Sequence, residues 1–135
     1  NPQVAIIGTS QTKFEADKGY EDIPETVFKV VQQAMAEAGI DRDDLDSIVT
    51  SSVDLWDGRT ASNQMLTDVV GSIMKPESRV AGDGLGAAFQ GMLAILAGAS
   101  GITLVVSQCR GSLGDHYEIS NWVFDPIYQQ PLGLD

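Results

Sequence analysis

The chain has 135 residues, 43% hydrophobic and 20% charged, a size and composition typical of one globular domain. Nineteen acidic residues against eight basic ones give a formal net charge of −11, which repels phosphate backbones and anionic lipid surfaces. Nucleic-acid and membrane-surface partners are therefore not expected. The single cysteine, Cys109, excludes an intrachain disulfide, and the chain has no CxxC or CxxH spacing to hold zinc. These features predict a cytoplasmic protein.

The first half of the chain predicts a strand, a helix and a second strand. Residues 4–8 (VAIIG) form a short apolar run, typical of a strand that is buried on both faces of an α/β sheet. Asp22 and Pro24 then open a helix in which apolar residues recur every three or four positions until Gly39. A second strand is expected over Ser47–Ser52. This order indicates a parallel crossover.

The second half repeats the alternation. A loop is expected over residues 54–60, a helix over residues 62–74, and a strand near residues 79–81, after Pro76. A glycine-rich turn over residues 82–86 then opens a long helix that ends near residue 97, and a strand follows over residues 102–107. The predicted fold class is therefore α/β, with the order βαβαβαβ and a mostly parallel sheet.

The uncharged run of residues 84–108 is long enough to cross a bilayer. Gly98, Ser100 and Gly101 interrupt it, and the residues after them are rich in β-branched side chains. The run is better interpreted as a buried helix followed by a buried strand. No basic segment precedes the apolar residues near the N-terminus, so no signal peptide is expected.

The acidic segment DRDDLD, residues 41–46, does not fit a calcium loop. An EF-hand needs oxygen ligands at alternate positions and glycine at the sixth, whereas Leu45 and Asp46 stand at these places. The segment instead predicts a single helical turn with Asp41 as its N-cap, where the early carboxylates suit the helix dipole.

Cys109 and His116 are candidates for a nucleophile and its base, with Asp115 as the residue that would orient the histidine. Their placement in a loop is equally typical of structural residues. The aromatic residues Trp56, Trp122 and Tyr128 are candidates to line an acyl pocket, although loop aromatics more often cover the edge of a core.

Residues 82–87 (GDGLGA) match GxGxxA, the pattern that lets a backbone approach a pyrophosphate at a helix N-terminus. The dinucleotide fingerprint belongs in the first βα turn, whereas this one follows the third predicted strand. The next strand ends in Ser107 and Gln108, where an acidic ribose ligand is expected. A strand that runs through glycine into a buried helix nevertheless suits a reacting atom, because free N–H groups there stabilise an anion.

The segments VAIIGTSQTKF, AEAGI, DDLDSIVTSS and SNQMLTDVVG occur in this order, before the glycine-rich turn and a helix and strand ending AGASGITLVVS. Together they resemble the N-terminal half of a thiolase, most closely of the sterol-carrier-protein type. The resemblance extends over nearly the whole chain, including the tail FDPIYQQPLGLD. It implies a thiolase-like layered N-terminal α/β domain over residues 1–107, and the truncated start of the family's loop region over residues 108–135.

Thiolases carry their cysteine nucleophile in a pattern like CxSGxxA at the N-terminus of the buried helix. When Gly84 and Ala87 are set on the motif's glycine and alanine, Ala81 takes the nucleophile's position and Asp83 that of the serine. A shift by one residue places Gly82 there instead. Cys109 lies beyond the next strand and is not the missing thiol. If Ala81 is the native residue, acyl transfer through a cysteinyl thioester is excluded.

The resemblance implies a coenzyme A thioester as substrate, no covalently bound cofactor, and the making or breaking of a carbon–carbon bond beside the thioester carbonyl. The reaction would be a Claisen-type thiolysis or, since the cysteine is missing, a retro-aldol cleavage. Asp83 is the candidate catalytic residue, and the candidates for substrate binding are Ala81, Gly82, Gly84 and Gly86. The acid and base belong to a C-terminal half absent from these residues, so this chain alone is not expected to be an enzyme.

The family also implies a homodimer or heterodimer with a thiolase-like subunit, formed through the third predicted strand around residues 78–81. Some relatives add a small zinc-ribbon and OB-fold companion. Two alternatives stay open. A non-catalytic thiolase-like subunit that stabilises an active partner fits Asp83 equally well, whereas a nucleotide-binding oxidoreductase domain depends on the glycines alone.

Overall fold

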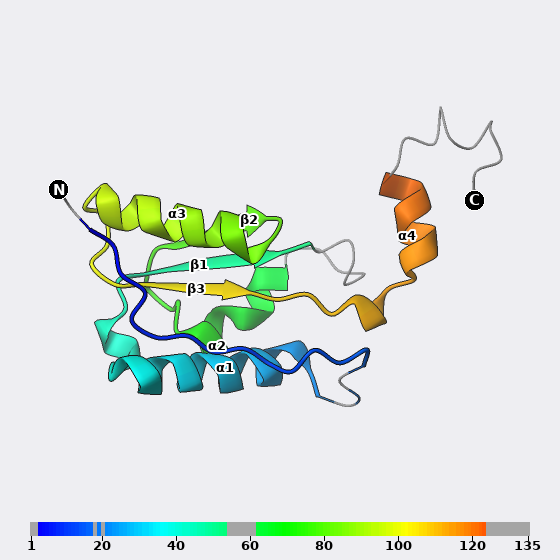
Figure 1. Ribbon diagram of the computed structural model, residues 1–135, viewed down its shortest axis with the longest axis horizontal. Coiled ribbons are helices and arrows are strands. Elements are labelled where there is room, and N and C mark those ends of the chain that lie inside the picture. The colour runs from blue at the N-terminus through cyan, green and yellow to red at the C-terminus, as the bar shows by residue number, and fades with distance from the viewer. Residues whose placement is uncertain (1–2, 18, 20, 54–61, 124–135) are drawn as a thin grey trace.

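The structure is a computed structural model that describes residues 3–17, 19, 21–53 and 62–123. Three parallel strands pair in the order β2-β1-β3, with α3 on one face of the sheet and α1 and α2 on the other (Figure 1). The predicted α/β class with a parallel sheet is confirmed. The strands are β1 (Ser47–Ser52), β2 (Glu77–Ala81) and β3 (Thr103–Ser107). The helices are α1 (Ile23–Ala38), α2 (Thr67–Val70), α3 (Gly84–Leu96) and α4 (His116–Val123).

Helix α1 begins and ends where the sequence predicts. The Asp22 carboxylate accepts a hydrogen bond from the Ile23 amide at 2.8 Å, and the Glu25 carboxylate accepts one from the Asp22 amide at 3.2 Å. Gly39 ends the helix with a φ of 68°, a conformation that costs glycine little. The caps thus set the length of the helix that covers one face of the sheet.

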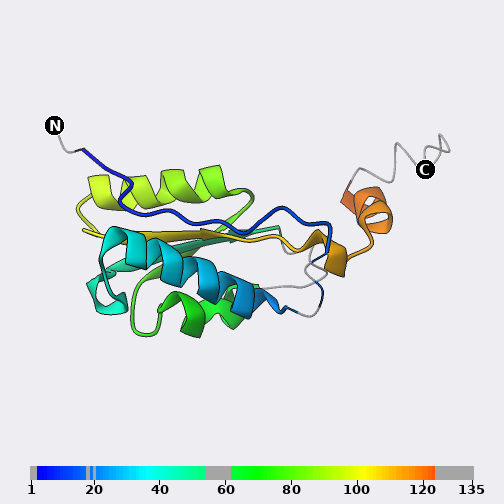
Figure 2. The same ribbon diagram turned by 60° about the horizontal axis from the view of Figure 1, so that its bottom comes forward.

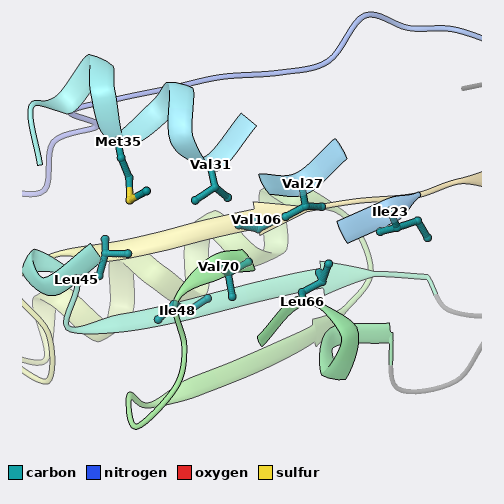
Figure 3. Packing of buried hydrophobic residues seen from close by; sticks show 9 residues of the cluster. All are labelled: Ile23, Val27, Val31, Met35, Leu45, Ile48, Leu66, Val70 and Val106. Carbon is teal, nitrogen blue, oxygen red and sulfur yellow. The ribbon is translucent and has the colours of Figure 1, made fainter. Parts of the chain in front are cut away.

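The hydrophobic core lies between the sheet and the layer formed by α1 and α2 (Figure 3). Helix α1 contributes one residue from each turn, because residues four apart share a helix face. Strand β1 contributes Ile48, which is fully buried. The core residues are Ile23, Val27, Val31, Met35, Leu45, Ile48, Leu66, Val70 and Val106.

The amino end of the sheet is held by Asp46, just before β1. Its carboxylate accepts hydrogen bonds from the Gly101 and Ile102 amides at 2.8 and 2.9 Å. Beside it, the Ser47 hydroxyl donates to the Ser100 hydroxyl at 3.0 Å. Backbone donors favour the ionised carboxylate, so the amide of Ile102, and then that of Gly101, lower the pKa of Asp46.

The helix predicted over residues 62–74 is shorter than expected. A 3₁₀ turn over Ser62–Leu66 leads into α2, which ends at Val70 because Gly71 adopts a left-handed cap with a φ of 73°. The following strand begins at Glu77, two residues earlier than predicted. After residue 107, where the sequence shows no periodicity, the chain forms α4, which stands away from the sheet (Figures 1 and 2).

The prediction of a buried strand over residues 4–8 is wrong for the described chain. The segment is extended, but it belongs to no sheet, and Ile6 and Ile7 are 84% and 53% exposed. It is held by α1 instead, because the Thr9 amide donates to the Glu37 carboxylate at 2.6 Å. A Cβ at Gly8 would lie 2.3 Å from the Ala34 carbonyl oxygen, so only glycine fits there.

The apolar helix over Gly84–Leu96 forms as predicted, but it is not buried throughout. Only Ala87 and Gly91 are buried, whereas Leu85 is 79% and Phe89 57% exposed. A Cβ at Gly91 would lie 2.8 Å from Val105 Cγ2, so one face of α3 packs tightly on the sheet while the other has no covering layer in the described residues. None of the described helices is long and apolar enough to cross a membrane.

The bonds to Asp46 predict a specific acid sensitivity. The pKa of Asp46 in the folded protein lies below its ordinary value of 3.8. The ionised carboxylate therefore stabilises the fold above that pH, and this stabilisation is lost as the pH falls through the folded pKa. Asp46→Asn should remove that part of the pH dependence, measured by urea unfolding from pH 2 to 6. Asp43→Asn is the control, since the Asp43 carboxylate makes no hydrogen bond or ion pair within the described part of the chain. An unchanged profile in Asp46→Asn would contradict the assignment.

Candidate functional site

The candidate site is the turn between β2 and α3, at the carboxyl edge of the sheet, where open α/β folds bind ligands. Ala81 is the last residue of β2, Asp83 is the N-cap of α3, and Gly84 is the first residue of the helix. Gly82 has a φ of 153°, which lets the chain reverse between strand and helix. The five residues proposed from the sequence, Gly86 included, thus lie in one turn.

Asp83 caps the helix that follows it. Its carboxylate oxygen accepts a hydrogen bond from the Gly86 amide at 2.9 Å, and its carbonyl accepts one from the Ala87 amide at 3.3 Å. The amide of Gly86 is therefore not available to a ligand. The amides of Gly84 and Leu85 have no partner within the described residues, so both are donors that the turn offers.

The glycines of the turn let α3 approach the sheet closely. A Cβ at Gly84 would lie 3.0 Å from the Ser107 Cβ, and one at Gly86 would lie 3.4 Å from Val80 Cγ1. Position 84 is therefore tighter than position 86. These contacts also show that Ser107 and Val80 point toward the first turn of α3.

Ser51 is a residue of the site that the sequence analysis did not identify. It pairs laterally with Val80 and Ser107, and neighbouring residues across a sheet point to the same face. Its side chain therefore points toward the first turn of α3. Ser51 is 1% exposed, and its hydroxyl has no hydrogen-bond partner in the described structure. A buried hydroxyl without a hydrogen bond lowers the stability of the fold. Such a group calls for an explanation, and a role in binding at this turn is one.

The opposite face of β2 carries two charged residues. Arg79 Nη2 donates to the Ser52 hydroxyl at 3.1 Å, and the Glu77 carboxylate accepts from Asn63 at 3.3 Å. Glu77 and Arg79 alternate along β2, so they share a face. This alternation is the signal that could have identified the pair from the sequence.

The other candidate residues are not brought to this turn by any described contact. Cys109 is exposed and lies between β3 and the 3₁₀ turn Gly111–Leu113. Asp115 caps α4, because its carboxylate accepts from the Tyr117 amide at 3.0 Å. The pairing of Cys109 with His116 stays a prediction, since the His116 side chain lies outside the description. The Trp122 side chain and the residues Trp56 and Tyr128 also lie outside the described residues, so their role in an acyl pocket stays a prediction.

The acidic segment of residues 41–46 forms the predicted helical turn, Arg42–Asp44, with Asp41 as its N-cap. The Asp44 carboxylate accepts a hydrogen bond from the Asp41 amide at 2.8 Å. Across the described ranges, no three His, Cys, Asp or Glu side chains are grouped closely enough to hold a metal ion.

Comparison with known proteins identifies the fold. No protein-family model matches the chain, and no curated protein matches its sequence. Among solved structures, the chain is similar to a chain of the Ltp2-ChsH2(DUF35) aldolase, with a TM-score of 0.68 and 24% sequence identity. The match covers 97% of this chain but only 34% of that chain. This chain therefore shares the fold of about a third of that longer chain. The name of the aldolase gives two components.

The turn predicts unequal effects on stability for two glycines that lie four residues apart. Gly82→Ala should destabilise the fold by about 1–3 kcal/mol, because alanine is strained at a φ of 153° although nothing lies within 4 Å of its Cβ. Gly86→Ala should be near neutral, since its Cβ meets Val80 at 3.4 Å and alanine favours the helix. Urea denaturation measures both, and equal losses would contradict the assignment of the strain to the backbone conformation of Gly82.

Proposed function

We propose that this chain forms the N-terminal part of a thiolase-like subunit that holds a coenzyme A thioester at the N-terminus of α3 for retro-aldol cleavage. One observation carries the proposal. The two free amides of Gly84 and Leu85 and the buried unpaired hydroxyl of Ser51 meet at one turn, at the sheet edge where ligands bind. The fold shared with an aldolase chain supports the choice of reaction.

The turn suits the charge that develops in such a cleavage. A base removes the proton of the β-hydroxyl group, and the bond between the α and β carbons breaks. The bond's electron pair delocalises onto the thioester oxygen as an enolate, an aldehyde or ketone leaves, and protonation of the α carbon gives the shortened acyl-CoA. Preorganised amides at a helix N-terminus stabilise the enolate oxygen, so Gly84 and Leu85 are the proposed donors.

In this proposal Asp83 is a positioning residue. An ionised carboxylate accepts hydrogen bonds and has no proton to donate to the thioester oxygen. Its bond to the Gly86 amide instead orients the first turn of α3, and with it the amides of Gly84 and Leu85. Ala81 and Gly82 provide the open backbone next to the donors, because neither carries a side chain that would fill the site.

The remaining machinery is assigned to polypeptide beyond these residues and to partner subunits. The proposal places the acid and base in a C-terminal half, and includes dimerisation with a thiolase-like subunit. Strand β2 is at an edge of the sheet, which leaves it open for pairing across such a dimer. A small zinc-ribbon and OB-fold companion completes the proposed assembly, in keeping with the two-component name of the similar aldolase.

A specific observation favours a second candidate, a non-catalytic subunit that stabilises an active partner. The negative charge of Asp83 lies against the N-terminus of α3, where an enolate would also lie. In this case changes to residues 81–86 that preserve assembly would leave turnover of the complex unchanged.

Two substitutions of Asp83 separate these candidates. In the natural subunit with its companion, Asp83→Ala should lower cleavage of β-hydroxyacyl-CoA by about tenfold or more while costing only about 1 kcal/mol of stability. Asp83→Asn should preserve both turnover and stability, because asparagine and aspartate are equally good N-cap residues. Product release and urea denaturation measure the two effects.

The outcomes for Asp83 assign its role. Full turnover in Asp83→Ala would contradict the proposed site and favour the non-catalytic subunit. A loss of turnover in Asp83→Asn with stability intact would show that the carboxylate itself takes part in the chemistry.

Ser51→Ala tests the proposed site from beneath the helix. Removing a buried unpaired hydroxyl should raise the free energy of unfolding without substrate, while coenzyme A thioester binding to the subunit weakens. Ser72→Ala is the matched control, because the Ser72 hydroxyl donates to the Thr67 carbonyl at 3.3 Å and its loss should destabilise the fold without affecting binding. Denaturation and calorimetric titration check both, and unchanged binding in Ser51→Ala would contradict the role of Ser51.

A further inference from the structure

Ser107, the last residue of β3, adds a hydroxyl group beside the candidate turn. A Cβ at Gly84 would lie 3.0 Å from the Ser107 Cβ and 3.2 Å from its Oγ, so this hydroxyl lies against the first residue of α3. Ser107 is exposed, and its side chain makes no hydrogen bond within the described residues. The hydroxyl is therefore accessible to a ligand that binds at the N-terminus of α3.

Ser107 stands next to the buried Ser51 in the sheet. The two residues are partners in the register of β1 and β3, and lateral neighbours in a sheet point to the same face. Ser51 is 1% exposed, and its hydroxyl has no hydrogen-bond partner in the described structure. This buried hydroxyl is an observation independent of the helix N-terminus, and it also points to a ligand at this edge of the sheet.

The polar groups of the turn differ in what they can bind. The amides of Gly84 and Leu85 only donate hydrogen bonds, and the oxygen of a thioester carbonyl has two lone pairs, which two amides fill. A serine hydroxyl both donates and accepts, as the hydroxyl group of a substrate does. Ser107 therefore complements a second oxygen of the ligand rather than the thioester oxygen itself.

A β-hydroxyacyl thioester carries such a second oxygen. Its carbonyl carbon and the carbon that bears the hydroxyl group are both bonded to the α carbon, so its two oxygens lie within a few ångström of each other. Because the Ser107 hydroxyl lies against Gly84, one acyl group can reach the amide of Gly84 and the side chain of Ser107 together.

We infer that Ser107 is a specificity-determining residue that hydrogen-bonds the β-hydroxyl oxygen of the acyl group, while the amides of Gly84 and Leu85 bind the thioester oxygen. The inference rests on the proposed function, which places a coenzyme A thioester at this turn. When the base removes the proton of the β-hydroxyl group, Ser107 donates a hydrogen bond to the oxygen that becomes negatively charged. As the bond between the α and β carbons breaks, its electron pair passes to the enolate, and this oxygen becomes the carbonyl oxygen of the aldehyde or ketone that leaves.

Ser107→Ala tests this role, because it removes the hydroxyl and keeps the Cβ that packs against Gly84. In the natural subunit with its companion, kcat/KM for cleavage of β-hydroxybutyryl-CoA should fall by about tenfold or more. Butyryl-CoA lacks the β-hydroxyl group, so its inhibition constant as a competitive inhibitor should stay unchanged. Stability in urea should also stay unchanged. Ser112→Ala is the control, since Ser112 is exposed in the 3₁₀ turn Gly111–Leu113 and should alter none of these quantities.

The outcomes separate this inference from the proposed function. An unchanged kcat/KM in Ser107→Ala would overturn the inference, and so would an equal loss of butyryl-CoA binding, which would place the effect on the thioester oxygen or on the turn itself. Turnover that is lost in Asp83→Ala but kept in Ser107→Ala would uphold the proposed function alone. If the unmodified complex neither cleaves β-hydroxybutyryl-CoA nor is inhibited by butyryl-CoA, the proposed function is overturned, and the inference with it.

Discussion

The close approach of α3 to the sheet is the constraint on which the rest of this structure depends. It requires glycine at positions 84 and 91, where a Cβ would lie 3.0 Å or less from side chains of β3. It also requires the small Ala87, which is fully buried. Because the helix lies so near the strands, its N-terminus comes directly above Ser51 at the carboxyl edge of the sheet. The geometry of the candidate site is thus a consequence of packing.

The same arrangement gives the two faces of the sheet different characters. The face that carries α1 and α2 holds the hydrophobic core around Ile48 and is closed by capped helices. The other face is covered by α3, whose outer surface exposes Leu85 and Phe89. Charge follows this division among the described residues, since Glu77 and Arg79 lie on the α2 side of β2, and Asp83 caps the helix on the other side.

Local signals in the sequence predicted the helices and strands whose ends are set by nearby capping or glycine residues. Asp22 and Gly39 bracket α1, and the uncharged run of residues 84–108 resolves into α3 and β3 because Gly98 and Gly101 interrupt it. The candidate turn was also predictable, since glycines before an apolar helix indicate close packing and a helix N-terminus. Residues 4–8 were not, because a strand forms only when a neighbour pairs with it, and no local pattern reports whether the neighbour is present.

The sequence by itself determined the α/β class, the parallel strands, the capped helix α1 and the turn at residues 81–86, because periodicity, caps and glycine act within a few residues of one another. Only the tertiary structure decided that Ser51 lies unpaired beneath α3 and that Arg79 bonds to Ser52. These facts depend on strand order and register, which bring residues together from distant parts of the chain. A side chain's partner is set by that assembly, whereas its tendency to form a helix or strand is set by its neighbours.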